Sequence, residues 1–203
     1  MAEILTTVFF MFAVIDPIGT IPVYLEATKE FDIIHKKKIA IRASIMAFLI
    51  LLFFIVIGQV ILDGMEVSLD AFQISGGVIL FLFALTMIFG EGKPEQEKNR
   101  ITDYKHVTIF PIAIPSLASP GAIMAVVLMT NNQIYSIQEQ AITSFIVLIV
   151  IGITCLILLT ANYLQKLIGS YGITVLSKIM GLILASYAIQ SILSGISNYF
   201  INA

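Results

Sequence analysis

The stretch Ala13-Val-Ile-Asp16-Pro17-Ile-Gly19-Thr20-Ile-Pro22 places an aspartate and two prolines in the middle of an apolar run. A second run, Pro115-Ser116-Leu-Ala-Ser119-Pro120-Gly121-Ala-Ile, repeats the arrangement, and its Ser119 lies 103 residues after Asp16. In each run a residue that caps helices precedes a proline, and a glycine follows closely. Inside lipid such a break is costly, because the freed backbone groups find no water to bond. The two runs therefore predict two interrupted membrane helices.

The composition predicts an integral membrane protein. Of the 203 residues, 59% are hydrophobic and 12% are charged, whereas soluble domains carry about 25% charged residues. The mean hydropathy is +1.01. Six apolar spans can be drawn, at about 4–25, 39–62, 71–89, 107–130, 141–163 and 173–200. At about 1.5 Å per residue the second is roughly 36 Å long, enough to cross a hydrocarbon core of about 30 Å. The roughly ten-residue alternating segments of a membrane β-barrel do not occur, so we expect an all-α fold.

The distribution of charge predicts an orientation. All 11 Lys and Arg residues lie in or beside the loops that follow the first, third and fifth spans: Lys29, Lys36, Lys37, Lys38, Arg42, Lys93, Lys98, Arg100, Lys105, Lys166 and Lys178. The opposite loops carry acidic residues and no base. Basic loops remain in the cytoplasm, so both termini are expected outside, in an inner (plasma) membrane.

The two halves correspond at an offset of 103 or 104. Asp16-Pro17 aligns with Ser119-Pro120, and Gly77 aligns with Gly181 in the third span of each half. Each half holds three spans, an odd number, so the second half enters the membrane from the opposite side. This predicts an inverted repeat, as in many secondary transporters. The expected units are residues 1–90, a cytoplasmic linker at 91–106, and residues 107–203.

The breaks form the candidate site. Each lies 12 residues into its span, roughly 18 Å from its own face and near the midplane. Because the halves are inverted, the two helices that start at the breaks should point their N-termini, with unpaired N–H groups, toward each other. Backbone donors beside one carboxylate suit a zwitterion. The predicted substrate-binding residues are Asp16, Pro17, Gly19, Thr20, Ser116, Ser119, Pro120 and Gly121 at the breaks, with Gly76 and Gly77 from the third span. Gly19 and Gly121 are expected to allow a ligand to approach the backbone closely. The alternatives are a pure capping role for Asp16, local hydrogen bonds for Thr20 and Ser119, and close helix packing for Gly76 and Gly77.

The chain resembles the MarC family of six-helix neutral amino acid transporters over nearly its whole length. The matching motifs are DPIGxIP at Asp16–Pro22, GGVILFLFALTMIFG at Gly76–Gly90, IPxLAxPGAI at Ile114–Ile123 and IMGLIL at Ile179–Leu184. The resemblance implies an inner-membrane protein that moves small neutral amino acids such as glycine or alanine. Two positions beside the site differ, since the family commonly has Asn at position 20 and Gly at position 119, where this chain has Thr20 and Ser119.

A secondary transporter is therefore the leading hypothesis, with drug or metabolite efflux and an ion channel as alternatives. An enzyme is not expected. An aspartyl intramembrane protease needs two facing aspartates, and only Asp16 lies within a span. A serine enzyme needs a base, and His35 and His106 both lie at the membrane edge. We expect no metal site, no cofactor and no nucleic-acid partner. The lipid bilayer is an expected partner; a coupling ion (proton or sodium) and a homo-oligomer are left open.

Overall fold

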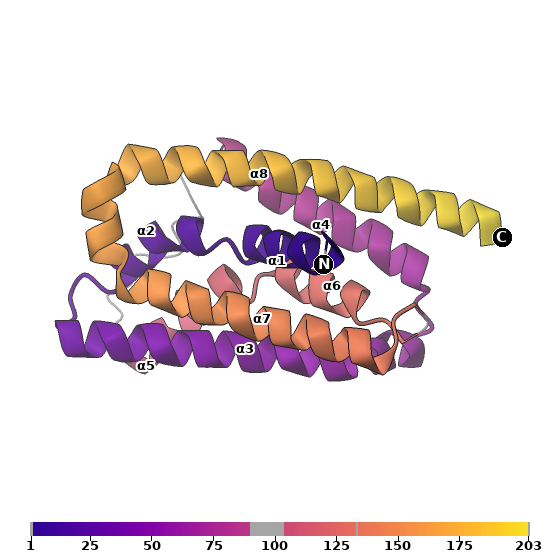
Figure 1. The fold of residues 1–203 in the computed structure, drawn as a ribbon, viewed down its shortest axis with the longest axis horizontal. Coiled ribbons are helices and arrows are strands. Elements are labelled where there is room, and N and C mark those ends of the chain that lie inside the picture. Colours follow the sequence, from indigo (N-terminus) through magenta and orange to yellow (C-terminus); the bar gives the residue numbers. More distant parts are fainter. Residues whose placement is uncertain (1, 90–103, 133, 203) are drawn as a thin grey trace.

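The computed structural model describes residues 2–89, 104–132 and 134–202, and every element in these ranges is helical. The elements are α1 (Ala2–Ile15), α2 (Pro17–Ala27), α3 (Ile33–Gly64), α4 (Leu69–Phe89), α5 (Tyr104–Val107), the irregular π-type segment η1 (Thr108–Leu117), α6 (Pro120–Met129), α7 (Ile137–Leu159) and α8 (Ala161–Asn202) (Figure 1).

The expected six-span membrane fold is confirmed. Five helical stretches are long and apolar enough to cross a bilayer, and a bent pair supplies the sixth crossing. The first crossing, Ile4–Ala27, joins α1 to α2 across Asp16. The fourth joins Tyr104–Leu117 to Pro120–Met129 with a bend of 55°. The first and fourth spans are therefore discontinuous, as the sequence predicts.

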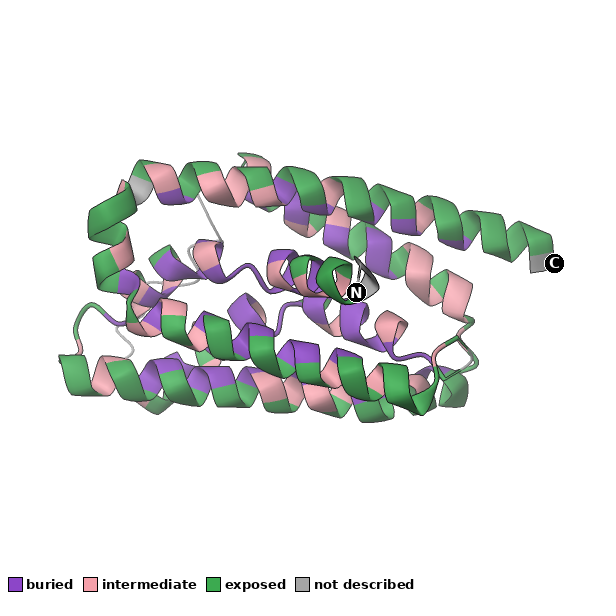
Figure 2. Ribbon diagram, viewed as in Figure 1, coloured by how far each residue is buried: buried purple, intermediate pink, exposed green. Residues whose placement is uncertain are grey.

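The broken spans lie inside the bundle, surrounded by continuous helices. In Figure 1, α3 and α7 run side by side along one edge, α4 and α8 run along the other, and α1, α2 and α6 lie between them. Burial follows this arrangement, because buried residues gather on the inner helices while the outer faces of α3, α7 and α8 are exposed (Figure 2). The exposed residues include many large apolar side chains, which is the surface a bilayer requires.

The offset of about 104 maps α1 onto η1, α2 onto α6, α3 onto α7, and α4 onto α8. Under this mapping the contacts between helices occur in matched pairs. The contact of α4 with α6 matches that of α8 with α2, and the contact of α3 with η1 matches that of α7 with α1. The contact of α3 with α6 likewise matches that of α7 with α2. The contacts α3–α7 and α4–α8 each map onto themselves. This is the pattern that a two-fold relation between inverted halves produces. The proposed unit boundaries stay a prediction, because residues 90–103, most of the linker at 91–106, lie outside the described residues.

A seam of small residues joins α4 to α8. A Cβ added at Gly77 would lie 3.1 Å from the carbonyl oxygen of Ala188, and one at Gly181 would lie 3.1 Å from that of Ala84. About two turns beyond, Gly195 meets the carbonyl of Asp70 at the same distance. Small residues allow helix backbones to approach this closely in membranes. The first two contacts are related by the same offset of 104, so the pseudo-two-fold axis passes through this seam.

Helix α8 is bent near the basic end of the molecule. Gly169 has φ 73° and ψ 161°, a conformation that is essentially confined to glycine. The residues before it lead away from α7 across this end, and those after it form the long membrane-spanning part, Tyr171–Ile201 (Figure 1).

Candidate functional site

The first break is built around Asp16. This residue has a left-handed backbone, φ 51° and ψ 65°, which aspartate tolerates better than most side chains. Its N–H still donates to the Phe12 carbonyl of α1, while its carboxylate accepts the Gly19 N–H of α2 at 2.9 Å. The Thr20 hydroxyl donates to the Asp16 carbonyl at 2.9 Å. Asp16 therefore ends one helix and caps the next, and it is only 2% exposed.

Pro17 and Gly19 are required by this local geometry. Pro17 occupies the first turn of α2, where its missing N–H costs nothing. A Cβ at Gly19 would fall on Oδ2 of Asp16 and lie 2.7 Å from its Cγ. Glycine at position 19 therefore leaves room for the capping carboxylate, and its part in substrate binding stays a prediction.

The second break repeats the cap with a neutral residue. Ser119 has an extended backbone, φ −70° and ψ 156°, and its hydroxyl accepts the Ala122 N–H at 3.1 Å. Ser119 is fully buried, as is nearby Ser116. Pro120 begins α6 and is exposed, which distinguishes it from the other nine predicted site residues, all of which are buried.

The two breaks lie near each other in the middle of the molecule. In Figure 1 both interruptions are central, with α2 leading to one end of the bundle and α6 to the other. A Cβ at Gly121, in the first turn of α6, would be 3.8 Å from Cγ1 of Val14, two residues before Asp16. The N-terminal ends of α2 and α6 carry the positive ends of their helix dipoles. The centre thus combines two donor-rich helix ends with one buried carboxylate.

The predicted glycines of the third span divide between two neighbours. A Cβ at Gly76 would meet Met124 of α6, with Sδ 2.8 Å away. Gly77 instead packs on Ala188 and Ile192 of α8. The structure thus brings Gly76 to the helix that begins at the second break and places Gly77 in the seam with α8. Their part in substrate binding stays a prediction.

The span before the second break is more irregular than the sequence analysis expected. Within η1, Phe110 and Ile114 have non-helical backbones, each directly before a proline of Pro111 and Pro115. A proline disfavours the helical conformation of the residue before it, so the signal was in the sequence. The corresponding part of the first span, α1, contains no proline and is a regular helix.

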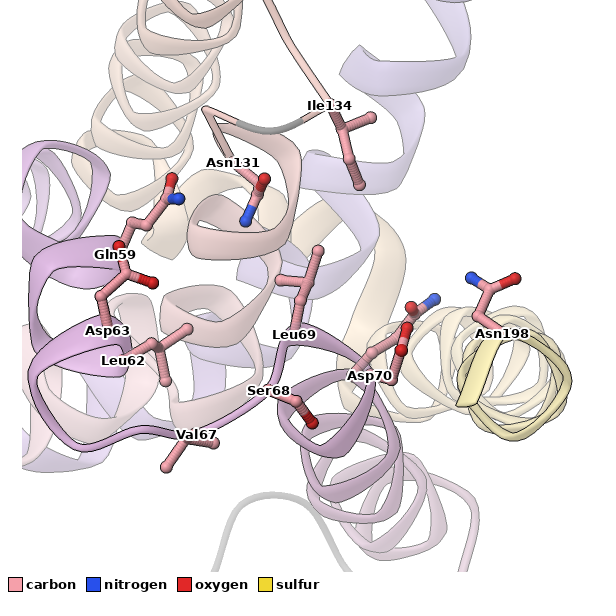
Figure 3. Close-up of a pocket in the computed structure, with 11 residues that line it drawn as sticks. Gln59, Leu62, Asp63, Val67, Ser68, Leu69, Asp70, Asn131, Ile134 and Asn198 are labelled. Atoms are coloured by element: carbon pink, nitrogen blue, oxygen red, sulfur yellow. The ribbon is translucent and has the colours of Figure 1, made fainter. Parts of the chain in front are cut away.

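A polar cavity, which sequence reasoning missed, opens at the acidic end of the bundle. Its volume is about 500 Å³. It is lined by Gln59, Leu62, Asp63, Val67, Ser68, Leu69, Asp70, Gln73, Asn131, Ile134 and Asn198, from α3, α4, α8 and the connection after α6 (Figure 3). Gln59 also fixes that connection, because its Oε1 accepts the Asn132 N–H at 2.6 Å. We call this space the acidic-end cavity.

The fold and the two broken spans define a multi-pass, all-helical membrane protein. A family model described as "MarC family integral membrane protein" matches residues 1–200. A UPF0056 membrane protein of Buchnera aphidicola is 33% identical over 206 residues, covering 100% of both chains. UPF0056 membrane proteins of Methanocaldococcus jannaschii and Pyrococcus horikoshii are 33% and 34% identical, covering 92% and 94% of this chain and 92% of each relative. No solved structure matches. The chain belongs to the MarC family, and the resemblance seen in the sequence is confirmed.

Proposed function

We propose that this protein is a secondary transporter of small neutral amino acids, and that the substrate binds between the two breaks. The carrying observation is Asp16, a buried carboxylate that caps α2 next to the N-terminal end of α6. An ionisable residue inside a membrane protein is expensive to bury, and it marks a substrate or ion pathway by default. The substrate carboxylate would take the backbone donors, and its ammonium group would face Asp16.

The size of the site supports a small substrate. Side chains that fill the centre, such as Val14 and Leu80, approach the first turn of α6 closely. The described residues near the breaks supply one carboxylate and no Lys or Arg. A glycine-like or alanine-like zwitterion fits this surface better than a bulky or strongly charged solute. We also propose the plasma membrane as the location, with the basic loops in the cytoplasm and both termini outside.

Uptake into proteoliposomes tests the proposal. Purified protein should take up labelled glycine, alanine or serine saturably, in parallel assays with and without a sodium gradient and a pH gradient. Asp16→Asn should abolish uptake while the fold survives, because asparagine retains the capping oxygen and tolerates the left-handed backbone. Only the charge changes.

Asp32→Asn is the matched control. Asp32 caps α3 just as Asp16 caps α2, by accepting the His35 N–H at 2.9 Å, but it is exposed beside the basic end. That hydrogen bond lowers the pKa of the Asp32 carboxyl. Uptake by Asp32→Asn should equal that of the unaltered protein. A well-folded preparation that takes up no small amino acid would refute the proposal, and ohmic currents would favour the channel.

A further inference from the structure

The acidic-end cavity holds two carboxylates in a polar wall. Asp63 and Asp70 come from the end of α3 and the start of α4, and Gln73 and Asn198 add amide groups (Figure 3). Neither carboxylate forms an ion pair with any residue that the structure describes. A hollow lined by one sign of charge raises the local concentration of solutes with the opposite sign. The cavity therefore favours solutes that carry a small cationic group.

Helix α6 leads inward from this cavity, and two of its side chains, which do not line the cavity, are seated over glycines. Met124 lies against Gly76 of α4, and Val127 lies against Gly58 of α3, with its Cγ2 2.6 Å from the position a Cβ would take. Met124 and Val127 are 3% and 4% exposed. Both glycines are within three residues of a lining residue, because Gln59 follows Gly58 and Gln73 precedes Gly76 by one turn. Along α6, Met124 and Val127 lie between the lining residue Asn131 and the cap Ser119, and we call this pair the floor.

The same pair of helices leads from the floor to the second break. Helices α4 and α6 run antiparallel, so contacts move inward along both: Gly76 with Met124, then Leu80 with Gly121 at 2.7 Å from its Cβ position. Ser119, the cap of α6, comes two residues before Gly121. In the opposite direction, toward the acidic end, α4 and α6 lead to Leu69 and Asn131, which both line the cavity. The floor thus separates the cavity from the breaks by about two helical turns.

We infer that the acidic-end cavity is the outer vestibule of the path to the two breaks, that it admits a solute bearing a small cationic group, and that Met124 controls access from it to the central site. The inference rests on the proposed function for the identity of the solute, and on the contacts alone for the path. Methionine is flexible and adapts its shape, so it can leave the space over Gly76 without a change of backbone. The cationic group is either the ammonium of an amino acid or a coupling cation.

Cysteine labelling tests the path without relying on transport. Cys155→Ser first removes the single cysteine of the chain. One cysteine is then introduced, either by Gln73→Cys in the cavity or by Ser119→Cys behind the floor. Membrane-impermeant cationic and anionic thiol reagents are then applied to the acidic side. The cysteine at 73 should react about tenfold faster with the cationic reagent than with the anionic one. Asp63→Asn together with Asp70→Asn should remove this preference.

The floor is tested at position 119. With Met124 intact, the cysteine at 119 should be protected. Met124→Ala should raise its labelling rate by about tenfold or more, because truncating this buried methionine leaves a cavity over Gly76. Met87→Ala is the matched control, because Met87 is also buried over a glycine, Gly181, but faces α8. Val127→Ala opens the floor on the Gly58 side, so the test survives if Met124→Ala fails to fold.

Each outcome decides the inference. Equal labelling at 119 with and without Met124 and Val127, or an equal increase from Met87→Ala, overturns the role of the floor. Equal rates for both reagents at 73 overturn the cationic preference. Protection of the cysteine at 73 by sodium chloride over choline chloride assigns the cation as solute, and protection by glycine assigns the ammonium. If the labelling is as predicted but no amino acid is taken up, the path is supported and the proposed function is refuted. If amino acids are taken up but the labelling differs, the proposed function stands and the path is refuted.

Discussion

Replacing Gly19 with alanine tests whether the first break depends on its capping carboxylate. The added Cβ would overlap Oδ2 of Asp16 and lie 2.9 Å from Oδ1, so the carboxylate must leave the Gly19 N–H that it now accepts at 2.9 Å. A hydrogen bond to a charged group contributes about 1.5–3 kcal/mol, and alanine regains about 0.5–1 kcal/mol of helix propensity. We expect Gly19→Ala to lower the free energy of unfolding by about 0.5–2.5 kcal/mol.

Thermal unfolding in detergent measures this change, and for a chain of this length it corresponds to a fall in Tm of about 1–10 °C. Gly152→Ala is the matched control, because Gly152 lies within α7 with nothing within 4 Å of its Cβ position. Asp16→Gly keeps the left-handed backbone and removes the carboxylate, so Gly19→Ala should cost almost nothing in that background. A full cost there, or a Gly19→Ala protein as stable as Gly152→Ala, would refute the reasoning.

Three further changes probe other features. Ser119→Ala removes the neutral cap of α6 and should cost about 0.5–2 kcal/mol, measured by the same melting assay; Ser119→Asn, which restores a capping oxygen, should recover most of it. Gly169→Ala forces a side chain into a glycine-only conformation and should cost about 1–3 kcal/mol; an unchanged Tm would show that α8 straightens freely. Gly181→Ala brings a Cβ to 2.9 Å from that of Met87 and should cost about 1–3 kcal/mol by overpacking, and a stability gain like that of Gly152→Ala would contradict the tight seam.

The sequence was sufficient for the spans and the breaks, because both leave strong local signals. Apolar length predicts the crossings, and a capping residue before proline predicts where a helix restarts. Helix starts outside the apolar spans were placed less well. Helix α3 begins at Ile33, six residues before the span drawn from 39, because Asp32 caps it. Ser136 and Glu139 form a capping box that starts α7 at Ile137 rather than at 141.

The division of labour among the glycines could not be predicted, because it depends on which neighbour each one faces. Gly76 and Gly77 are adjacent in sequence yet meet different helices, α6 and α8. The structure shows that Gly19 faces the Asp16 carboxylate, a neighbour that the sequence pattern does not reveal. The acidic-end cavity was missed for the same reason, since its wall assembles from residues between 59 and 73, from 131 and 134, and from 198, which lie far apart in the sequence.

The small-residue seam between α4 and α8 also restricts where this chain can gain or lose residues. Asp70, Gly77 and Ala84 are spaced seven apart, as are Gly181, Ala188 and Gly195, and the three close approaches of a glycine to a facing carbonyl join members of these two rows. One inserted residue turns everything beyond it by about 100° around the helix axis. A single insertion within either row would therefore place bulky side chains where two backbones now nearly touch, whereas an insertion of seven residues would keep the row on one face. Length variation is expected in the loops between the helices and excluded from these stretches.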